Sequence, residues 1–351
     1  MTHKTAIGWA TDSANPYRYQ KGGWHCVKVS EGCRHCYAEG INKRFGGQGN
    51  RLPYRVDSRQ HLGEMSLSEK ILADWLNPQR PTRRIFVNSM TDTFLETVPD
   101  ELVFRLFDTM AAAKKQLFYV LTKRAQRMAA LILDWLDSSG HERVPNNIML
   151  GVSIESHKVV QERMHWLGMV PALRFVSAEP LLGPVDLSAY LFPQWTSEEI
   201  QAPPGGIGFP PTLRAARLKN SILDWLIIGG ESGTGARPLP PAHVARLIGQ
   251  AEGAGVKVFF KQWGSWWPLP ELVQHHGAPD TPLAYRSWGV LAEDGTVESS
   301  SNYRDKGKWR LPDVDDGRTV IVKPPREIAP ASATLNGVVY EQYSPLHQPQ
   351  G

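Results

Sequence analysis

Three cysteines carry the most specific chemistry in this sequence. They are Cys26, Cys33 and Cys36, they fall within eleven residues, and the chain of 351 residues has no other cysteine. An odd number of cysteines so close together in the sequence does not indicate a disulfide framework. The clustering indicates that the three thiols share a ligand.

The spacing Cys-x6-Cys-x2-Cys leaves three interpretations open. Three thiolates suit a 4Fe–4S cluster in which one iron lacks a protein ligand and is open to a small molecule. A structural zinc site would need His25, His35 or a more distant histidine as fourth ligand, and neighbours in sequence ligate one metal poorly. Incidental buried thiols are the third reading, which the lack of cysteine elsewhere disfavours.

Short apolar runs and helical patterns that alternate along the chain must position these residues. A strand in a helix-covered parallel sheet is apolar on both faces, and βαβ units take about 30 residues. Helical periodicity is expected over residues 100–113, 124–136, 156–167 and 241–254. The alternation predicts an α/β fold with a parallel sheet, as a barrel or a doubly wound sheet. The expected strands are Ile85–Ser89, Leu117–Leu121, Ile148–Val152, Leu173–Ser177, Trp225–Gly229 and Lys257–Lys261, with a weaker candidate at Ala6–Ala10.

Polar side chains follow every one of the six strands, where parallel α/β folds place their sites. Carboxylates and cations both occur there, and glycines in residues 229–233 would let the backbone approach a ligand closely. The candidates are Asn88, Asp92, Lys123, Arg124, Ser153, Glu155, Glu179, Gly230, Glu231, Lys261, Gln262 and Trp263.

Composition limits the class of protein. The net charge of +4 permits a nucleic-acid partner without requiring one. No stretch approaches the ~18 apolar residues of a membrane helix, and the N-terminus lacks the apolar region of a secretory signal. We therefore expect a cytoplasmic protein with no membrane association.

One basic segment favours nucleic acid or a nucleotide as the substrate. Residues 42–59 carry five cations against one acid, with Phe45 and Tyr54 among them, a mixture that suits single-stranded nucleic acid. Trp263, Trp266 and Trp267 are candidates to stack on a base. A solvated surface loop and a tryptophan-rich core patch are the plainer alternatives.

Seven blocks in order resemble a known family. They include Cys-x6-Cys-x2-Cys-Tyr-Ala-Glu and the segments 87–92, 121–124, 150–155, 179–184, 229–233 and 260–264. They resemble a phage-associated three-cysteine family of unknown function, which is similar to radical S-adenosylmethionine enzymes. The commonest spacing in those enzymes is Cys-x3-Cys-x2-Cys, so the first gap here is longer.

The resemblance implies a partial (β/α)6 TIM-like barrel over residues 1–268 with an insertion near 190–220, followed by a small irregular appendage and tail over 269–351. Cys26, Cys33 and Cys36 would hold the 4Fe–4S cluster. Ser153, Glu155, Glu179, Gly230 and Glu231 would bind S-adenosylmethionine.

The other candidates are expected to act on the substrate. Lys123 and Lys261 would be catalytic, and Asn88, Asp92, Arg124, Gln262 and Trp263 would bind the substrate. Family members are often encoded beside a partner protein, so activity that requires a second protein is a further option. The alternative from a different class is a zinc-stabilised nucleic-acid-binding protein without catalysis.

Overall fold

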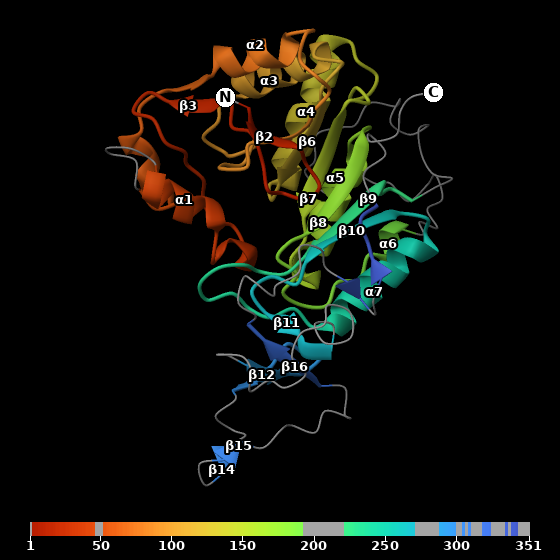
Figure 1. The fold of residues 1–351 in the computed structure, drawn as a ribbon. Coiled ribbons are helices and arrows are strands. Elements are labelled where there is room, and N and C mark those ends of the chain that lie inside the picture. Colours follow the sequence, from red (N-terminus) through yellow and green to blue (C-terminus); the bar gives the residue numbers. More distant parts are fainter. Residues whose placement is uncertain are drawn as a thin grey trace.

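A computed structural model gives the fold of the chain (Figure 1). It describes residues 2–45, 52–191, 221–270, 288–299, 304–305, 308–309, 318–323, 334–335 and 338–342. The insertion expected near 190–220 lies outside the described residues beyond position 191.

A curled, mostly parallel sheet of eight strands forms a half-barrel at the centre of the molecule (Figure 1). The first two strands pair antiparallel, and every later neighbour pairs in parallel. The six expected strands are present as β5 to β10, and β7 is buried along its whole length, as its apolar sequence predicts. The strand order is β1 (His3–Lys4), β2 (Asp12–Ala14), β5 (Arg84–Val87), β6 (Leu117–Thr122), β7 (Ile148–Ser153), β8 (Leu173–Ala178), β9 (Trp225–Gly229) and β10 (Lys257–Gln262).

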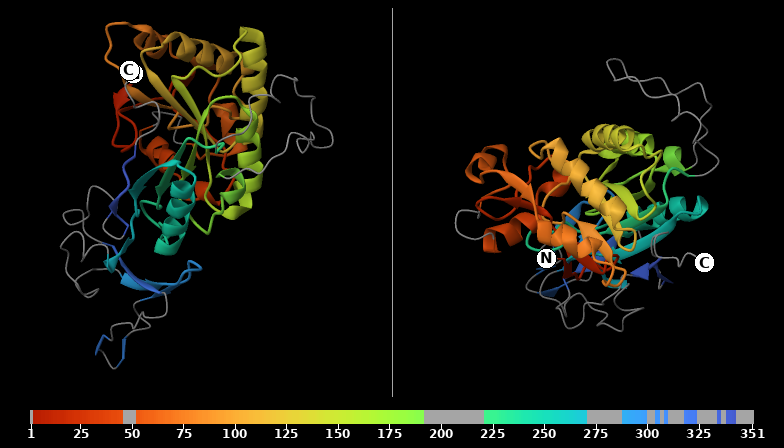
Figure 2. Two further views of the ribbon diagram at one scale, coloured as in Figure 1. Left: turned by 90° about the vertical axis from the view of Figure 1, so that its right-hand side faces the viewer. Right: turned by 90° about the horizontal axis from the view of Figure 1, so that it is seen from above.

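Helices cover the outer, convex face of the curled sheet (Figure 2). Their apolar stripes bury against the strands in one large core. The four expected helices are α3, α4, α5 and α7, and their ends differ from the expectation by a few residues. The helices are α1 (Tyr37–Phe45), α2 (Glu69–Leu76), α3 (Asp100–Ala112), α4 (Ala125–Ser139), α5 (Val160–Met169), α6 (Ser188–Leu191) and α7 (Pro241–Gly253).

Aromatic side chains fill the inner, concave face of the half-barrel around Trp9. The Trp9 ring lies 4.9 Å from that of Phe86, 5.6 Å from Tyr119 and 6.0 Å from Trp225, between centroids. The strand expected at Ala6–Ala10 is therefore wrong. This segment is a loop that places an indole in the barrel interior, and the strands lie on either side of it as β1 and β2.

The C-terminal part is more regular than expected. β11 (Trp267–Pro268), β16 (Thr319–Val322), β12 (Trp288–Leu291) and β13 (Val297–Ser299) form a four-stranded antiparallel sheet. Residues 340–342 then run beside the edge strand β10, where Phe260 N–H donates to Tyr340 O at 2.7 Å and Gln342 N–H to Val258 O at 3.0 Å. At these residues the expected tail is ordered against the sheet, where it satisfies an otherwise open edge.

Three two-stranded antiparallel sheets complete the described strands: β3 (Tyr17–Tyr19) pairs with β4 (Met65–Leu67), β14 (Arg304–Asp305) with β15 (Lys308–Trp309), and β17 (Thr334–Leu335) with β18 (Val338–Val339). Within the described ranges, no helix is long and apolar enough to span a bilayer.

Candidate functional site

The segment that carries the cysteines, residues 24–36, lies across the carboxyl ends of the parallel strands; we call it the cysteine loop. Thr91, which follows β5, donates its hydroxyl to His25 O. Arg124, which follows β6, donates from Nη2 to Val27 O at 3.0 Å. The loop therefore occupies the end of the sheet where α/β folds place their sites.

Contacts with the later strands hold the other half of the loop. Arg237, in the segment after β9, donates from Nη2 to Glu31 O at 3.1 Å. Gly32 packs on the Glu155 side chain after β7, where an added Cβ would lie 3.3 Å from its carboxyl carbon. Each half of the cysteine loop is thus tied to the sheet by an arginine.

The three thiols are partly buried neighbours that influence one another electrostatically. Cys26 and Cys36 pack against the apolar cluster of Ala38, Tyr54 and Met90. Burial and then the Asp92 carboxylate raise the pKa of Cys26 to about 12 in the metal-free chain, against a lowering by Arg124. A metal bound by these thiols would have to displace their protons.

The start of α1 stabilises negative charge on Cys36. Burial raises the pKa of this thiol, but backbone N–H groups of Glu39 and Ala38 hydrogen-bond to its sulfur and lower the pKa in part. The charge of Lys123 acts in the same direction. Hydrogen bonds to sulfur and nearby cations are the means by which proteins tune thiolate-bound clusters.

The side chains around the cysteine loop are not arranged as a ready site for one metal ion in the described structure. In the described part of the chain, no three His, Cys, Asp or Glu side chains are grouped so that they could hold one ion. The thiolates of a cluster bind different irons, so a cluster requires neighbouring thiols rather than ligands around one point. The adjacent histidines lie elsewhere: His25 packs between the rings of Tyr19 and Tyr54, and His35 against Gly235.

Each of the three predicted carboxylates has a cationic partner. Glu155 pairs with Arg163 at 2.8 Å and is almost fully buried. Glu231 binds Arg237 through both oxygens, at 2.7 and 2.8 Å. Glu179 pairs with Lys261 at 2.8 Å, and both side chains keep some exposure. The sequence placed these groups at one end of the sheet, and the structure adds that they form ion pairs there.

Three predicted substrate ligands are internal side chains. Asp92 receives hydrogen bonds from Thr122 Oγ1 at 2.6 Å and Arg124 Nη1 at 3.1 Å, and Arg124 also pairs with Glu96. Asn88 is buried in the left-handed conformation (φ 58°) and donates to Thr93 Oγ1 at 3.0 Å. All three side chains therefore have partners inside the chain, although Asn88 Oδ1 is buried without a hydrogen-bond partner among the described residues. Their substrate-binding role stays a prediction.

Other predicted residues also have structural roles. Ser153 is buried, and its carbonyl accepts a bond from Arg163 Nη1 at 2.7 Å. A Cβ at Gly230 would lie 1.9 Å from Trp263 O. Glycine is thus required here because the backbone of Trp263 packs closely against it.

Two aromatic candidates for base stacking are buried. Trp263 is 0% exposed and donates Nε1–H to Thr334 O at 3.1 Å. Tyr54 is 3% exposed and donates its hydroxyl to Met90 O at 2.6 Å. Neither ring can stack on a base in this structure.

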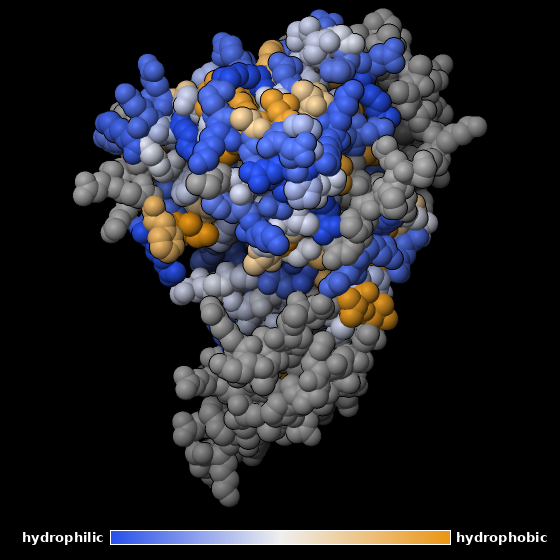
Figure 3. All heavy atoms as spheres, turned by 45° about the horizontal axis from the view of Figure 1, so that its top comes forward, coloured by the Kyte–Doolittle hydropathy of each residue, from blue (hydrophilic) through white to orange (hydrophobic). Residues whose placement is uncertain are grey.

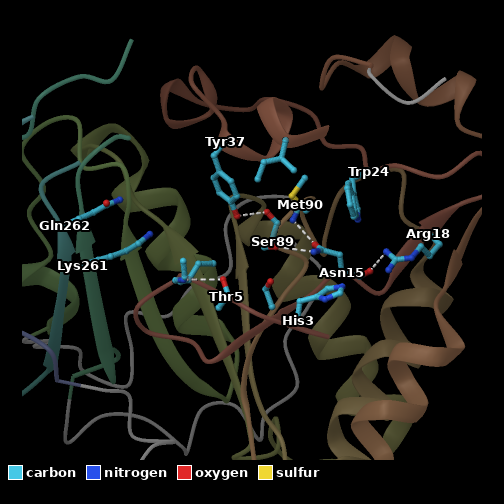
Figure 4. Close-up of a pocket in the computed structure, with 14 residues that line it drawn as sticks. His3, Thr5, Asn15, Arg18, Trp24, Tyr37, Ser89, Met90, Lys261 and Gln262 are labelled. Carbon is cyan, nitrogen blue, oxygen red and sulfur yellow. Dashed lines mark hydrogen bonds between the residues drawn. The ribbon is translucent and has the colours of Figure 1, made fainter. Parts of the chain in front are cut away.

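A cavity of about 480 Å³ lies beside the cysteine loop, between the first and last strands of the sheet (Figure 4). Only Lys261 and Gln262 of the predicted residues line it. The sequence analysis missed the rest of the wall, which comes from the N-terminal segment between His3 and Trp24, from α1 and from the loop after β5. The added polar and aromatic lining residues include His3, Asn15, Arg18, Trp24, Tyr37 and Ser89.

The comparison with known proteins places the chain in one family. No curated protein and no solved structure matches it. The family model described as "Protein of unknown function (DUF5131)" matches residues 4–342, which is nearly the whole chain. The chain therefore belongs to the DUF5131 family.

Proposed function

We propose that this protein is a radical S-adenosylmethionine-type iron–sulfur enzyme that modifies or repairs nucleic acid or a nucleotide. The observation that carries the proposal is the position of three neighbouring thiols over the carboxyl ends of a curled parallel sheet, with cations beside them. The half-barrel is compatible with the partial (β/α)6 barrel of those enzymes. The similarity of the three-cysteine motif to theirs supports the same reading.

Cys26, Cys33 and Cys36 would hold a 4Fe–4S cluster. When reduced, such a cluster with an open iron supplies the electron that cleaves S-adenosylmethionine to a 5′-deoxyadenosyl radical. The residues of the chain would bind and orient the cluster and S-adenosylmethionine. Lys123 and Arg124 lie near the thiols and offset the negative charge of thiolates.

Glu179 is the carboxylate best placed to meet the cationic groups of S-adenosylmethionine. It keeps 15% side-chain exposure, whereas Glu155 and Glu231 keep 2% and 5%. The backbone N–H of Leu181 bonds to Gly229 O at 3.0 Å and ties the loop after Glu179 to β9. The protein fixes this carboxylate at the rim of the sheet without burying it.

The first experiment measures iron, acid-labile sulfide and zinc in protein purified without oxygen. We expect about four iron and four sulfide per chain, and their loss in the Cys33→Ala variant. Val29→Ala is the matched control, because Val29 lies in the same loop with 46% exposure. One zinc without sulfide would replace this proposal by the zinc-stabilised nucleic-acid-binding protein.

A cluster-loaded protein is then tested with S-adenosylmethionine and dithionite. Formation of 5′-deoxyadenosine is the expected result. A stable cluster with no cleavage, alone or with a co-encoded partner protein added, would contradict the enzymatic part of the proposal.

A further inference from the structure

The cavity beside the cysteine loop has walls of two kinds, and Figure 4 shows both. Arg18, His3 and Asn15 lie on one side, and Lys261 and Gln262 on the other. Tyr37, Met90 and Trp24 lie between and above them. The residues come from segments as distant as 3 and 262, so the half-barrel must curl for the cavity to exist.

The charge of the walls is positive. The fourteen lining residues include arginine, lysine and histidine but no aspartate or glutamate. Lys261 pairs with Glu179 at 2.8 Å, just outside the lining. Arg18 has no carboxylate partner among the described residues: its Nη1 donates to the carbonyls of Asn15 and Tyr17.

Arg18 is therefore the cation available to an anion. It is half-buried on β3, and burial lowers the pKa of its guanidinium, although an arginine stays protonated at neutral pH. Two backbone carbonyls orient the group and leave other N–H donors for a ligand. A phosphate matches such a planar set of donors.

Aromatic and apolar side chains form the rest of the cavity. Tyr37 and Ile41 are one turn apart on α1 and are 55% and 38% exposed. Phe45, 74% exposed, continues this stripe along the helix. Figure 3 shows apolar side chains exposed among polar ones on the side where α1 lies. The Trp24 indole N–H is buried without a hydrogen-bond partner in the described part of the chain.

Hydrogen bonds fix the floor between the two sides. Asn15 donates from Nδ2 to Ser89 Oγ at 3.2 Å and accepts from Met90 N–H at 2.8 Å. Tyr37 donates its hydroxyl to Ser89 O at 2.7 Å. Since Tyr37 directly follows Cys36, these bonds place the cavity against the candidate cluster site.

From this combination we propose that the cavity binds one nucleotide unit, with Arg18 on its phosphate and Trp24 and Tyr37 against its base. The inference rests on the proposed function and names its substrate site. S-adenosylmethionine is the other nucleoside in that reaction, and its sulfonium and amino groups are cationic. The lining contains no carboxylate, and Glu179, which contacts the cavity residue Lys261, lies outside the lining. The volume of about 480 Å³ is within the range of small-molecule sites.

The test is calorimetric binding of thymidine 5′-monophosphate, thymidine and short oligothymidylate to the metal-free full chain. We expect the monophosphate to bind at least about tenfold more tightly than thymidine, because Arg18 hydrogen-bonds its phosphate. Arg18→Gln should remove that advantage and leave thymidine binding unchanged. Arg105→Gln is the matched control, since Arg105 is an exposed arginine on α3 paired with Glu69.

A second variant tests the base. Trp24→Ala should weaken both the nucleoside and the nucleotide about tenfold, and Trp24→Phe should restore most of the loss. Circular dichroism and melting temperature confirm that each variant is folded. If oligothymidylate also binds in an Arg18-dependent manner, the nucleotide unit belongs to a nucleic-acid strand. If only the monophosphate binds, the ligand is a free nucleotide.

Three outcomes would overturn the inference: no nucleotide binding at low salt, equal binding by Arg18→Gln and Arg105→Gln, or displacement of the nucleotide by S-adenosylmethionine. Because the metal-free chain is used, this test is independent of the cluster. Arg18-dependent binding without any iron in the purified protein would retain the nucleotide site and discard the radical chemistry.

Discussion

At the scale of single residues, the polar groups at the strand ends are of two kinds. Some form ion pairs inside the protein, and others face the cavity. Burial acts to raise the pKa of Glu231, but hydrogen bonds from the Arg237 side chain and backbone outweigh it, so the pKa lies below its usual value. The pairs of Arg124 with Asp92 and of Arg163 with Glu155 are almost fully buried. In the Lys261–Glu179 pair both side chains keep some exposure, and Arg237 is 28% exposed beside the buried Glu231.

Glu231→Gln tests the energetic role of the pair that the buried Glu231 forms with Arg237. A carboxylate with a lowered pKa stabilises the folded state above its unfolded pKa, and this stabilisation is lost as pH falls through the folded pKa. We expect the variant to lose about 2 kcal/mol of unfolding free energy at pH 7, and much less at about pH 3. Urea unfolding at the two pH values measures both quantities.

Glu69→Gln is the control for this comparison, because Glu69 is 67% exposed and its pair with Arg105 lies at the surface. It should change the unfolding free energy by less than about 1 kcal/mol. An equal loss in Glu231→Gln at both pH values would contradict an electrostatic role for Glu231.

At the scale of elements, the cysteine loop has little regular structure of its own. Its only helical turn in the described structure is the short 3-10 helix Glu31–Cys33. Its position depends on Arg124 and Arg237, which reach its carbonyls from the segments after β6 and β9. These arginines act as positioning residues for the thiols.

Arg237→Gln should loosen the loop. Loss of the bonds to Glu31 is expected to raise amide hydrogen exchange of residues 26–36 by about tenfold. In cluster-loaded protein, iron should also pass faster to a chelator. Hydrogen-exchange mass spectrometry measures the first effect and absorbance the second.

Arg105→Gln again serves as the control, since Arg105 contacts Glu69 rather than the loop. Unchanged exchange over residues 26–36 in Arg237→Gln would show that Arg237 does not hold the loop.

At the scale of the whole molecule, two apolar layers on opposite faces of the curled sheet stabilise the half-barrel. The helices cover one face, and the aromatic cluster around Trp9 fills the other. Residues 340–342 close the β10 edge. The carboxyl ends are left for the cysteine loop and the cavity.

Trp9→Ala should destabilise the protein by about 4 kcal/mol. The substitution opens a cavity, and the surrounding aromatic rings cannot shift to fill it. Trp9→Phe, which keeps most of the ring volume, should cost about half as much. Chemical unfolding with the iron content fixed measures the difference. A loss below about 1 kcal/mol in Trp9→Ala would show that the indole is not a core residue.

The sequence by itself determined the α/β class, the six strands β5 to β10, four of the helices and the clustering of the thiols. These features depend on hydrophobic periodicity and spacing, which short contiguous segments contain. The sequence did not identify the loop that places Trp9 in the barrel, because a short apolar run looks the same in a strand and in a buried loop.

Only the tertiary structure decided which polar residues pair internally and which line a cavity. Lys261 and Glu179 are 82 residues apart, and Arg237 and Glu31 are 206 apart. Arg18 and Trp24 have no local pattern that marks them as a wall shared with Gln262. Ion pairs and cavities depend on contacts between distant segments, and the curl of the sheet creates those contacts.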